Sequence, residues 1–365
     1  MTAFVPGLEL AAALYHETVA PILSRRFPGL VCSAALLGTG SEVLRFDTGR
    51  STDHEWGPRL QIFVRESDHA DVAPAIHDEL RRALPPEIRG FPTDFGPPDD
   101  EGIRVLRRVD AGLIEHKVEV LTVPAFLADR LGIADWRGLT PVDWLLFSQQ
   151  GLLEVTAGAV FHDGLGELEP ARAAFAWYPS DVWLLLMAAQ WTRIGQLEPF
   201  VGRSGEVGDE VGSALVAATL ARDVMSLGFL LERRYAPYPK WFGSAFASLA
   251  CAAPLLSVLG RVLTSQHWHE REAALCQAYE ALAVMHNALG ISAPLPDRVS
   301  QFHGRPFRVI HGQRFAEALR AAIADEAVRC LPEGIGGVDQ WIDSTDVLSN
   351  ADRRLKLRPL YTSAP

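Results

Sequence analysis

Two carboxylates stand two residues apart in the segment STDHEW, residues 51–56. In an extended strand, side chains at positions i and i+2 point to the same face, so Asp53 and Glu55 are expected to project side by side. Carboxylates this close repel each other unless one is protonated or a cation bridges them. Mg²⁺ is a hard ion that prefers carboxylate and phosphate oxygens, so the pair predicts a magnesium site.

A glycine-containing turn precedes this acid pair, and 11 residues separate its last member, Ser41, from the first acid. The run LVCSAALL, residues 30–37, has the apolar character of a buried strand, and Gly38-Thr39-Gly40-Ser41 follows it directly. Glycine has no Cβ, so the backbone at Gly38 and Gly40 can approach a phosphate closely. Backbone N–H groups of the turn, together with the Ser41 hydroxyl, therefore predict a cradle for a triphosphate.

The segment IEHKVEVLTV, residues 114–123, supplies a third carboxylate in a strand-like setting. Glu119 stands there between two valines, and a carboxylate in an apolar strand is costly unless a metal site or a positive group lies nearby. We therefore assign Glu119 to the same metal site as the acid pair. Asp110 and Glu115 are its rivals for this role.

The order of these features resembles the polymerase-β-like nucleotidyltransferase superfamily: a strand, a Gly-Ser turn, an acid pair and a later apolar-acid-apolar strand. Residues 38–63 and 200–246 resemble, more narrowly, a family of uncharacterised bacterial proteins. That family has a nucleotidyltransferase-like N-terminal domain and a helical C-terminal domain. The resemblance extends from about residue 8 to about residue 330.

The resemblance implies transfer of a nucleoside monophosphate, with ATP as the expected donor, to a hydroxyl, with release of pyrophosphate. It implies two Mg²⁺ ions, held by Asp53, Glu55 and Glu119, with Glu119 serving as second-metal ligand, general base or both. The acceptor is expected to be a small molecule or a protein side chain. The formal net charge of −11 argues against a nucleic-acid acceptor, because an acidic surface repels phosphate backbones.

A lysine in the second half of the chain is assigned by the same resemblance. In related transferases the second domain supplies a lysine to the nucleotide phosphates, and Lys240 is the candidate here. It lies in the segment YAPYPKW, residues 235–241, where two prolines restrict the backbone. A lysine that only covers an aromatic surface patch is the competing interpretation.

Two departures from the superfamily pattern leave other functions open. The acid pair is Asp-x-Glu where Asp-x-Asp is commoner, and His54 stands between the acids where an apolar residue is usual. A nucleotide-binding or regulatory protein without turnover is therefore one alternative, and a phosphotransferase that uses the same metal site is another. A dinucleotide fold is a distant alternative, because Val43 occupies the position of the third glycine.

The periodicity of the sequence predicts an α+β protein in two domains. Helices are expected over 8–28 and 69–84, and strands over 30–37, 59–65, 103–108 and 113–123. After residue 124 nearly all segments suit helices, with a strand or hairpin over 152–162. We place a nucleotidyltransferase-like domain at 1–135, a helical substrate- and nucleotide-binding domain at 136–345, and a C-terminal tail at 346–365. The chain after Leu331, rich in Gly, Asp and Ser, is expected to be loop with one short helix.

Composition and the N-terminal residues suggest where the protein acts. The 365 residues are 48% hydrophobic and include four cysteines without a C-x-x-C pair. The first ten residues lack a basic segment followed by an apolar run, and no uncharged apolar stretch is long enough to span a membrane. We therefore expect a cytoplasmic protein with reduced cysteines and no membrane partner.

Overall fold

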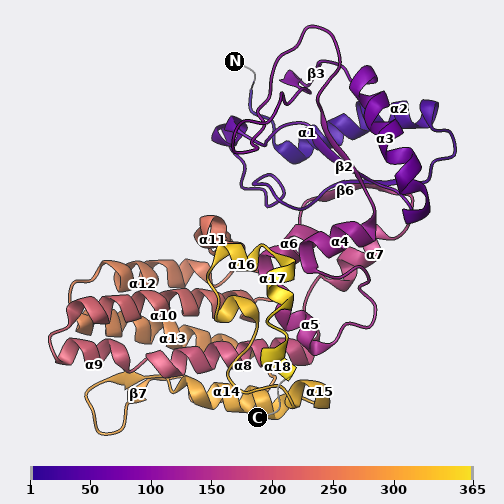
Figure 1. Cartoon of the computed structure of the whole chain (residues 1–365). Coiled ribbons are helices and arrows are strands. Elements are labelled where there is room, and N and C mark those ends of the chain that lie inside the picture. The colour runs from indigo at the N-terminus through magenta and orange to yellow at the C-terminus, as the bar shows by residue number, and fades with distance from the viewer. Residues whose placement is uncertain (1–2, 363–365) are drawn as a thin grey trace. The chain divides into compact units, whose positions relative to one another are not determined.

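The computed structural model describes residues 3–362, and these fall into two compact units (Figure 1). The first unit comprises the chain up to Gly138 together with Gly151–Ala176. The second comprises Leu139–Gln150 and the chain from Trp177 onward. The α+β class is confirmed: a mixed sheet lies in the first unit and helices dominate the second. Residues 151–176 differ from the expected domain limits, because they carry a strand that belongs to the sheet of the first unit.

A four-stranded sheet organises the first unit in the order β5-β2-β1-β6. β1 pairs antiparallel with both β2 and β6, whereas β2 pairs parallel with β5. Residues 30–37 and 59–65 therefore contain strands as expected, and 113–123 contains β5. The strands are β1 (Ser33–Leu36), β2 (Arg59–Phe63), β5 (Lys117–Leu121) and β6 (Ala159–Asp163).

One face of this sheet packs against the N-terminal helices and α3 (Glu66–Ala83). The chain from residue 7 to residue 26 is helical, with a π-helical stretch in its middle: α1 (Gly7–Ala13), η1 (Leu14–Val19) and α2 (Ala20–Arg26). Leu60, Ile62 and Val118 point into this core. Because side chains alternate along a strand, Gln61 and Glu119 belong to the opposite face.

The remaining elements of the first unit connect and flank the sheet. Two short strands, β3 (Glu87–Ile88) and β4 (Phe91–Pro92), pair with each other. The stretch 103–108, expected as a strand, contributes only an isolated bridge between Asp94 and Arg107. The flanking helices are η2 (Gly49–Asp53), α4 (Val123–Leu131), α6 (Gln149–Thr156) and α7 (Leu168–Ala174). The expected strand over 152–162 is thus the end of α6 followed by β6.

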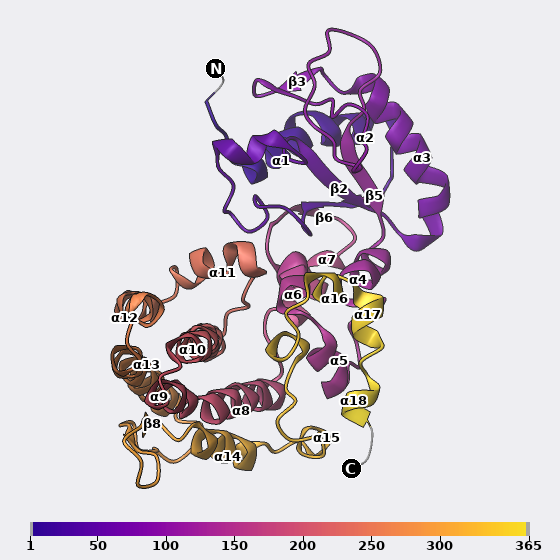
Figure 2. The ribbon, with the colours of Figure 1, turned by 60° about the vertical axis from the view of Figure 1, so that its left-hand side comes forward.

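Long helices form the second unit, and Figure 2 shows α10 with α8, α9, α11, α12 and α13 around it. They are α5 (Pro141–Leu146), α8 (Ser180–Leu197), α9 (Phe200–Glu206), α10 (Glu210–Leu231), α11 (Pro239–Phe246), α12 (Ala252–Thr264), α13 (Trp268–Ala288) and α14 (Gly312–Ala322). Within the described chain, α10 is the one helix long and apolar enough to cross a membrane, and 56% of its apolar window is buried. A buried core helix meets the same criteria.

The C-terminal part has more structure than the sequence predicts. A short hairpin, β7 (Ser300–Gln301) and β8 (Arg308–Val309), precedes α14. The stretch after Leu331, expected as loop with one short helix, instead contains several short helices, because N-caps such as Asn350, whose side chain accepts from Arg353 N–H, begin new turns. They are η3 (Val338–Gln340), α16 (Thr345–Leu348), α17 (Ala351–Leu355) and α18 (Pro359–Thr362), and α15 (Glu326–Arg329) precedes them.

Candidate functional site

The turn that follows β1 presents backbone N–H groups in an unusual conformation. Gly38 and Gly40 have φ angles of 84° and 136°, which residues other than glycine rarely adopt. Gly38 N–H donates to the Glu154 carbonyl at 2.8 Å, which fixes the start of the turn. Across residues 3–362, the N–H groups of Thr39, Gly40 and Ser41 and the Ser41 hydroxyl have no protein hydrogen-bond partner. Successive N–H groups of this kind form an anion-binding concavity.

Two guanidinium groups lie against this turn. Arg59, the first residue of β2, donates from Nη2 to the Thr39 carbonyl at 2.8 Å and forms an ion pair with Glu42, which is 2% exposed. A Cβ on Gly40 would lie 2.5 Å from Arg59 Nη2, so only glycine fits there. Arg130 of α4 lies on the other side, 3.4 Å from the position of a Cβ on Gly38. Each guanidinium is itself paired with a carboxylate, Arg59 with Glu42 and Arg130 with Glu154 at 3.1 Å, so the turn is bordered by ion pairs.

The acid pair does not lie in a strand, so this expectation was wrong. Asp53 ends the 3₁₀ turn η2, and β2 begins only at Arg59. Glu55 has a φ of 51°, in the left-handed region, and therefore breaks the alternation that would align it with Asp53. Asp53 is exposed and pairs with His54 Nδ1 at 2.8 Å, so His54 is a surface residue and not a core residue.

Glu55 is held by groups from a distant part of the chain. Its N–H donates to the Arg104 carbonyl at 2.9 Å, and Arg104 N–H donates to Glu55 Oε1 at 2.7 Å. The other carboxylate oxygen forms an ion pair with the ammonium of Lys117, the first residue of β5. Both oxygens of Glu55 are thus occupied within the protein.

Lys117 lies among three carboxylates. Besides Glu55, the charges of Glu119 and Glu42 act on it. Burial lowers the pKa of the Lys117 ammonium, while Glu119 and Glu42 act in the opposite direction. Glu119 itself is exposed and lies opposite Gln61 in the β2–β5 register. The ammonium of Lys117 is therefore the positive group that the apolar setting of Glu119 predicted, in place of a metal ion.

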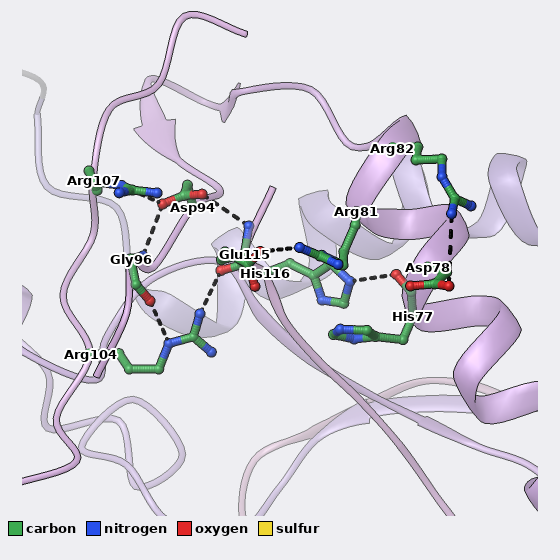
Figure 3. Close-up of polar contacts among 10 residues, drawn as sticks. All are labelled: His77, Asp78, Arg81, Arg82, Asp94, Gly96, Arg104, Arg107, Glu115 and His116. Atoms are coloured by element: carbon green, nitrogen blue, oxygen red, sulfur yellow. Dashed lines mark hydrogen bonds and ion pairs between the residues drawn. The ribbon is translucent and has the colours of Figure 1, made fainter. Parts of the chain in front are cut away.

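A network of polar contacts fixes the loop before β5 (Figure 3). Asp94 is fully buried and accepts from the N–H groups of Gly96 and Glu115 and from Arg107 Nε, at 2.9, 3.0 and 3.0 Å. Burial alone would raise the pKa of Asp94, but these hydrogen bonds outweigh it and the pKa lies below its usual value. Arg104 donates to the carbonyls of Gly96 and Glu115 at 2.8 and 3.0 Å. Arg104 is therefore fixed twice: its backbone by the contacts with Glu55, and its side chain by the carbonyls of Gly96 and Glu115.

The two rivals of Glu119 have other positions. Glu115 forms an ion pair with Arg81 of α3, and Asp110 lies exposed in the loop between β4 and β5. Trp56 is 2% exposed and donates from Nε1 to Asp47 Oδ2 at 3.0 Å, so it is a core residue.

The carboxylates offer the donor chemistry that Mg²⁺ prefers, but their arrangement is not that of a formed metal site. Within residues 3–362, no three His, Cys, Asp or Glu side chains gather closely enough to hold a metal ion. For Glu55 to become a ligand, the ion pair with Lys117 must open.

Lys240 lies in the second unit, at the start of α11. Its Nζ lies 5.2 Å from the ring centroid of Trp241, and the side chain is exposed. The preceding turn is fixed, because Ala236 N–H and Tyr238 N–H donate to the side chains of Gln149 and Gln150 at 2.7 and 3.1 Å.

Sequence reasoning missed the cations of the site: Arg59, Arg104, Lys117 and Arg130. A usable signal existed for Lys117, because it stands two residues before Glu119 and a strand places both on one face. Arg104 and Arg130 gave no such signal, since each reaches the site through contacts distant in sequence.

Comparison with known proteins adds little to this geometry. A family described as a domain of unknown function (DUF4037) matches residues 144–242. None of the curated proteins matches the chain. Among solved structures, a nucleotidyltransferase-like protein from Exiguobacterium sibiricum 255-15 is similar over 79% of this chain and 82% of its own, at 11% identity and a TM-score of 0.33. A TM-score of 0.33 is too low to carry a fold or an activity across.

Proposed function

We propose that the first unit binds the phosphates of a nucleoside triphosphate at residues 38–41 and transfers the nucleoside monophosphate to a hydroxyl group. The observation that carries this proposal is the turn itself. Three successive N–H groups without protein partners stand beside the guanidinium groups of Arg59 and Arg130. Backbone N–H groups and arginine forks are the donors that phosphates prefer.

The proposed reaction breaks one phosphoanhydride bond. The acceptor oxygen forms a bond to the α-phosphorus, the bond from that phosphorus to the bridging oxygen breaks, and pyrophosphate leaves with the electron pair. The proton of the hydroxyl passes to a carboxylate, for which Glu119 is the candidate because it is exposed beside Lys117. ATP is the proposed donor, and a small molecule or a protein side chain the proposed acceptor.

Mg²⁺ would supply charge neutralisation on the phosphates, with Asp53, Glu55 and Glu119 as its proposed ligands. In the conformation described here, Lys117 takes that role at Glu55. Lys117 and Arg59 can also offset charge on the phosphates themselves.

A second function is favoured by one observation. The ion pair between Lys117 and Glu55 satisfies a carboxylate that a two-metal mechanism requires to be free. A protein that binds a nucleotide at the same turn without turnover would keep this pair closed.

Nucleotide binding and turnover, measured separately, test both functions. We expect ATP to raise the melting temperature and pyrophosphate to accumulate when a pool of metabolites and proteins is added with MgCl₂. Asp53→Asn and Glu55→Gln should each abolish pyrophosphate release, whereas Asp71→Asn, at an exposed site on α3, should not. ATP binding without pyrophosphate release would support the second function. Unchanged turnover in the double variant would exclude the assigned acids.

A further inference from the structure

A groove runs along the outer edge of the sheet in the first unit. β5 is the edge strand, since β2 pairs with one side of it only and the sheet order ends there. The groove has a volume of about 600 Å³ and is lined by all five residues of β5. Its opposite wall is α3, where Ala70, Ala73 and Pro74 present small side chains. A groove between an edge strand and a helix can accommodate an extended peptide that adds to the strand.

The backbone of β5 alternates between its two sides. Val64 N–H donates to the Leu121 carbonyl, so residues 117, 119 and 121 direct their N–H and C=O groups toward β2. Val118 and Val120 direct theirs outward. Two of these four outward groups are already bonded: Val118 N–H donates to His116 Nδ1 at 3.1 Å, and the Val120 carbonyl lies 3.0 Å from His69 Nε2.

The other two outward groups, the Val118 carbonyl and the Val120 N–H, have no partner among residues 3–362. This pair can bind an added strand. In an added parallel strand, the residue that pairs with a given residue of β5 donates its N–H to the carbonyl of the β5 residue before that one. Its own carbonyl accepts from the N–H of the β5 residue after it. Here that residue of β5 is Glu119. An antiparallel strand whose non-hydrogen-bonded pair lies at Glu119 uses the same two groups, so they accept an added strand in either direction.

We propose that this groove binds an extended acidic peptide segment of a partner protein, which adds to β5 as a further strand. Charge complementarity identifies the peptide as acidic. Arg104 and Lys117 line the groove against Glu119 as the one acid among the lining residues. Because Glu55 already pairs with Lys117, Arg104 is the cation that remains for an acidic side chain. The two valine groups supply affinity that does not depend on sequence, and Arg104 selects the partner.

The register also assigns a role to the bound peptide, which rests on the proposed nucleotidyl transfer. The peptide residue opposite Glu119 places its side chain on the same face of the sheet as Glu119. A serine or threonine at that position brings its hydroxyl beside the proposed base. The acceptor class is then a hydroxyl side chain within an extended acidic segment, not a small molecule.

The test uses the full chain and a fluorescein-labelled peptide of nine residues. The peptide has a central serine, valine at the even positions and aspartate at the remaining odd positions. Val120→Pro removes the outward N–H, and proline is tolerated at that side of an edge strand. Val120→Thr keeps both the N–H and the shape, and is the matched control.

We expect saturable binding by fluorescence anisotropy for the wild type and Val120→Thr, and affinity about tenfold weaker for Val120→Pro. A peptide with lysine in place of aspartate should not bind. Absence of binding to the wild type, or equal binding by Val120→Pro, would overturn the proposal. Self-association that Val120→Pro abolishes would identify a second copy of the chain as the occupant and would also overturn it.

Two further measurements keep the outcomes separate. If Val120→Pro does not fold, hydrogen exchange at Val120 in the wild type decides, because a bound strand slows it and an empty edge does not. With ATP added, mass spectrometry of the peptide shows whether its serine gains a nucleoside monophosphate. A peptide that binds without modification, while ATP binds at residues 38–41, overturns the acceptor role alone. A peptide that binds when ATP does not bind leaves the groove intact and refutes the proposed function.

Discussion

The ammonium of Lys117 and the carboxylate of Glu55 form an ion pair between the first residue of β5 and the segment that precedes β2. The side chains are 19% and 35% exposed, so solvent screens the pair only in part. Arg104 N–H holds the other oxygen of Glu55, which leaves the carboxylate little freedom to turn away from Lys117. Opening this pair is the step that separates the structure described here from any state in which Glu55 binds a metal.

Lys117→Gln tests that relationship directly. Without the ammonium, Glu55 and Glu119 lose their counter-charge, and we expect the metal-free protein to lose about 1–2 kcal/mol of stability. Added MgCl₂ should recover much of this loss in the variant and should change the wild type little. Lys117→Arg keeps the charge and is the control. A variant whose melting temperature does not respond to MgCl₂ would contradict a latent metal site at these acids.

The turn at residues 38–41 is tested by Gly40→Ala. A Cβ at a φ of 136° is strained, and it would lie 2.5 Å from Arg59 Nη2 and 2.6 Å from Glu42 Oε2. We expect about 1–3 kcal/mol less stability and a loss of ATP affinity of about tenfold or more, because the N–H groups of the turn lose their alignment. Gly49→Ala, where nothing lies within 4 Å of the added Cβ, should bind ATP normally. Calorimetric titration with ATP compares the two variants, and equal affinities would remove the turn from the nucleotide site.

The sequence predicted the part of this site that local rules determine. A buried apolar run followed by a glycine turn identified β1 and residues 38–41, because both signals lie in adjacent residues. The position of the acid pair was not predictable in this way. Gly57 has a φ of 145° and packs where a Cβ would meet Leu106 and Phe95, so the strand starts late. Arg104, which fixes Glu55, stands 49 positions further along the chain.

The same reason explains the limits of the domain prediction. Residues 152–162 suit a strand or hairpin by themselves, and nothing in their pattern shows that β6 pairs with β1. Strand pairing between distant segments depends on packing that periodicity does not record. The α+β class itself was predictable, since it depends only on the sum of local patterns.

His116 gives a pH dependence with a definite sign. Burial lowers its pKa from 6.5 to about 4, and its ring nitrogens bond the Val118 N–H and the His77 carbonyl. Between pH 6.5 and about pH 4, His116 is protonated in the unfolded chain and neutral in the folded protein. The stabilising effect is complete above pH 6.5 and is lost as the pH falls toward 4, by about 3 kcal/mol in total.

His116→Gln should remove this part of the pH dependence. Urea unfolding of the wild type and the variant at several pH values between 4 and 7 measures it as the difference between the two curves. His286, whose pKa is likewise lowered to about 4, acts in the same direction in the second unit and cancels in that difference. Parallel curves for the two proteins would show that folding does not lower the pKa of His116.

Lys240 is the residue whose two interpretations differ most clearly in their consequences. If it only covers an aromatic surface, its contact with Trp241 stabilises the fold by about 0.5–1 kcal/mol, and its removal does not change the kinetic constants for ATP. If it contacts the nucleotide, it acts on a pyrophosphate that gains charge as the bond breaks, and it stabilises the transition state more than the ground state. Lys240→Ala should then lower kcat and raise KM for ATP, with a melting temperature close to that of the wild type.

The fixed turn before Lys240 makes this variant informative. Gln149 and Gln150 hold the backbone at Ala236 and Tyr238, so loss of the side chain should not disturb α11. Lys240→Arg should restore activity only in part, because a planar fork does not replace a compact point charge. Lys356→Ala, at an exposed lysine of the same unit, controls for the loss of one positive charge. An unchanged kcat/KM for ATP in Lys240→Ala, matching that of Lys356→Ala, would assign Lys240 to the surface and leave the phosphates to Arg59 and Arg130.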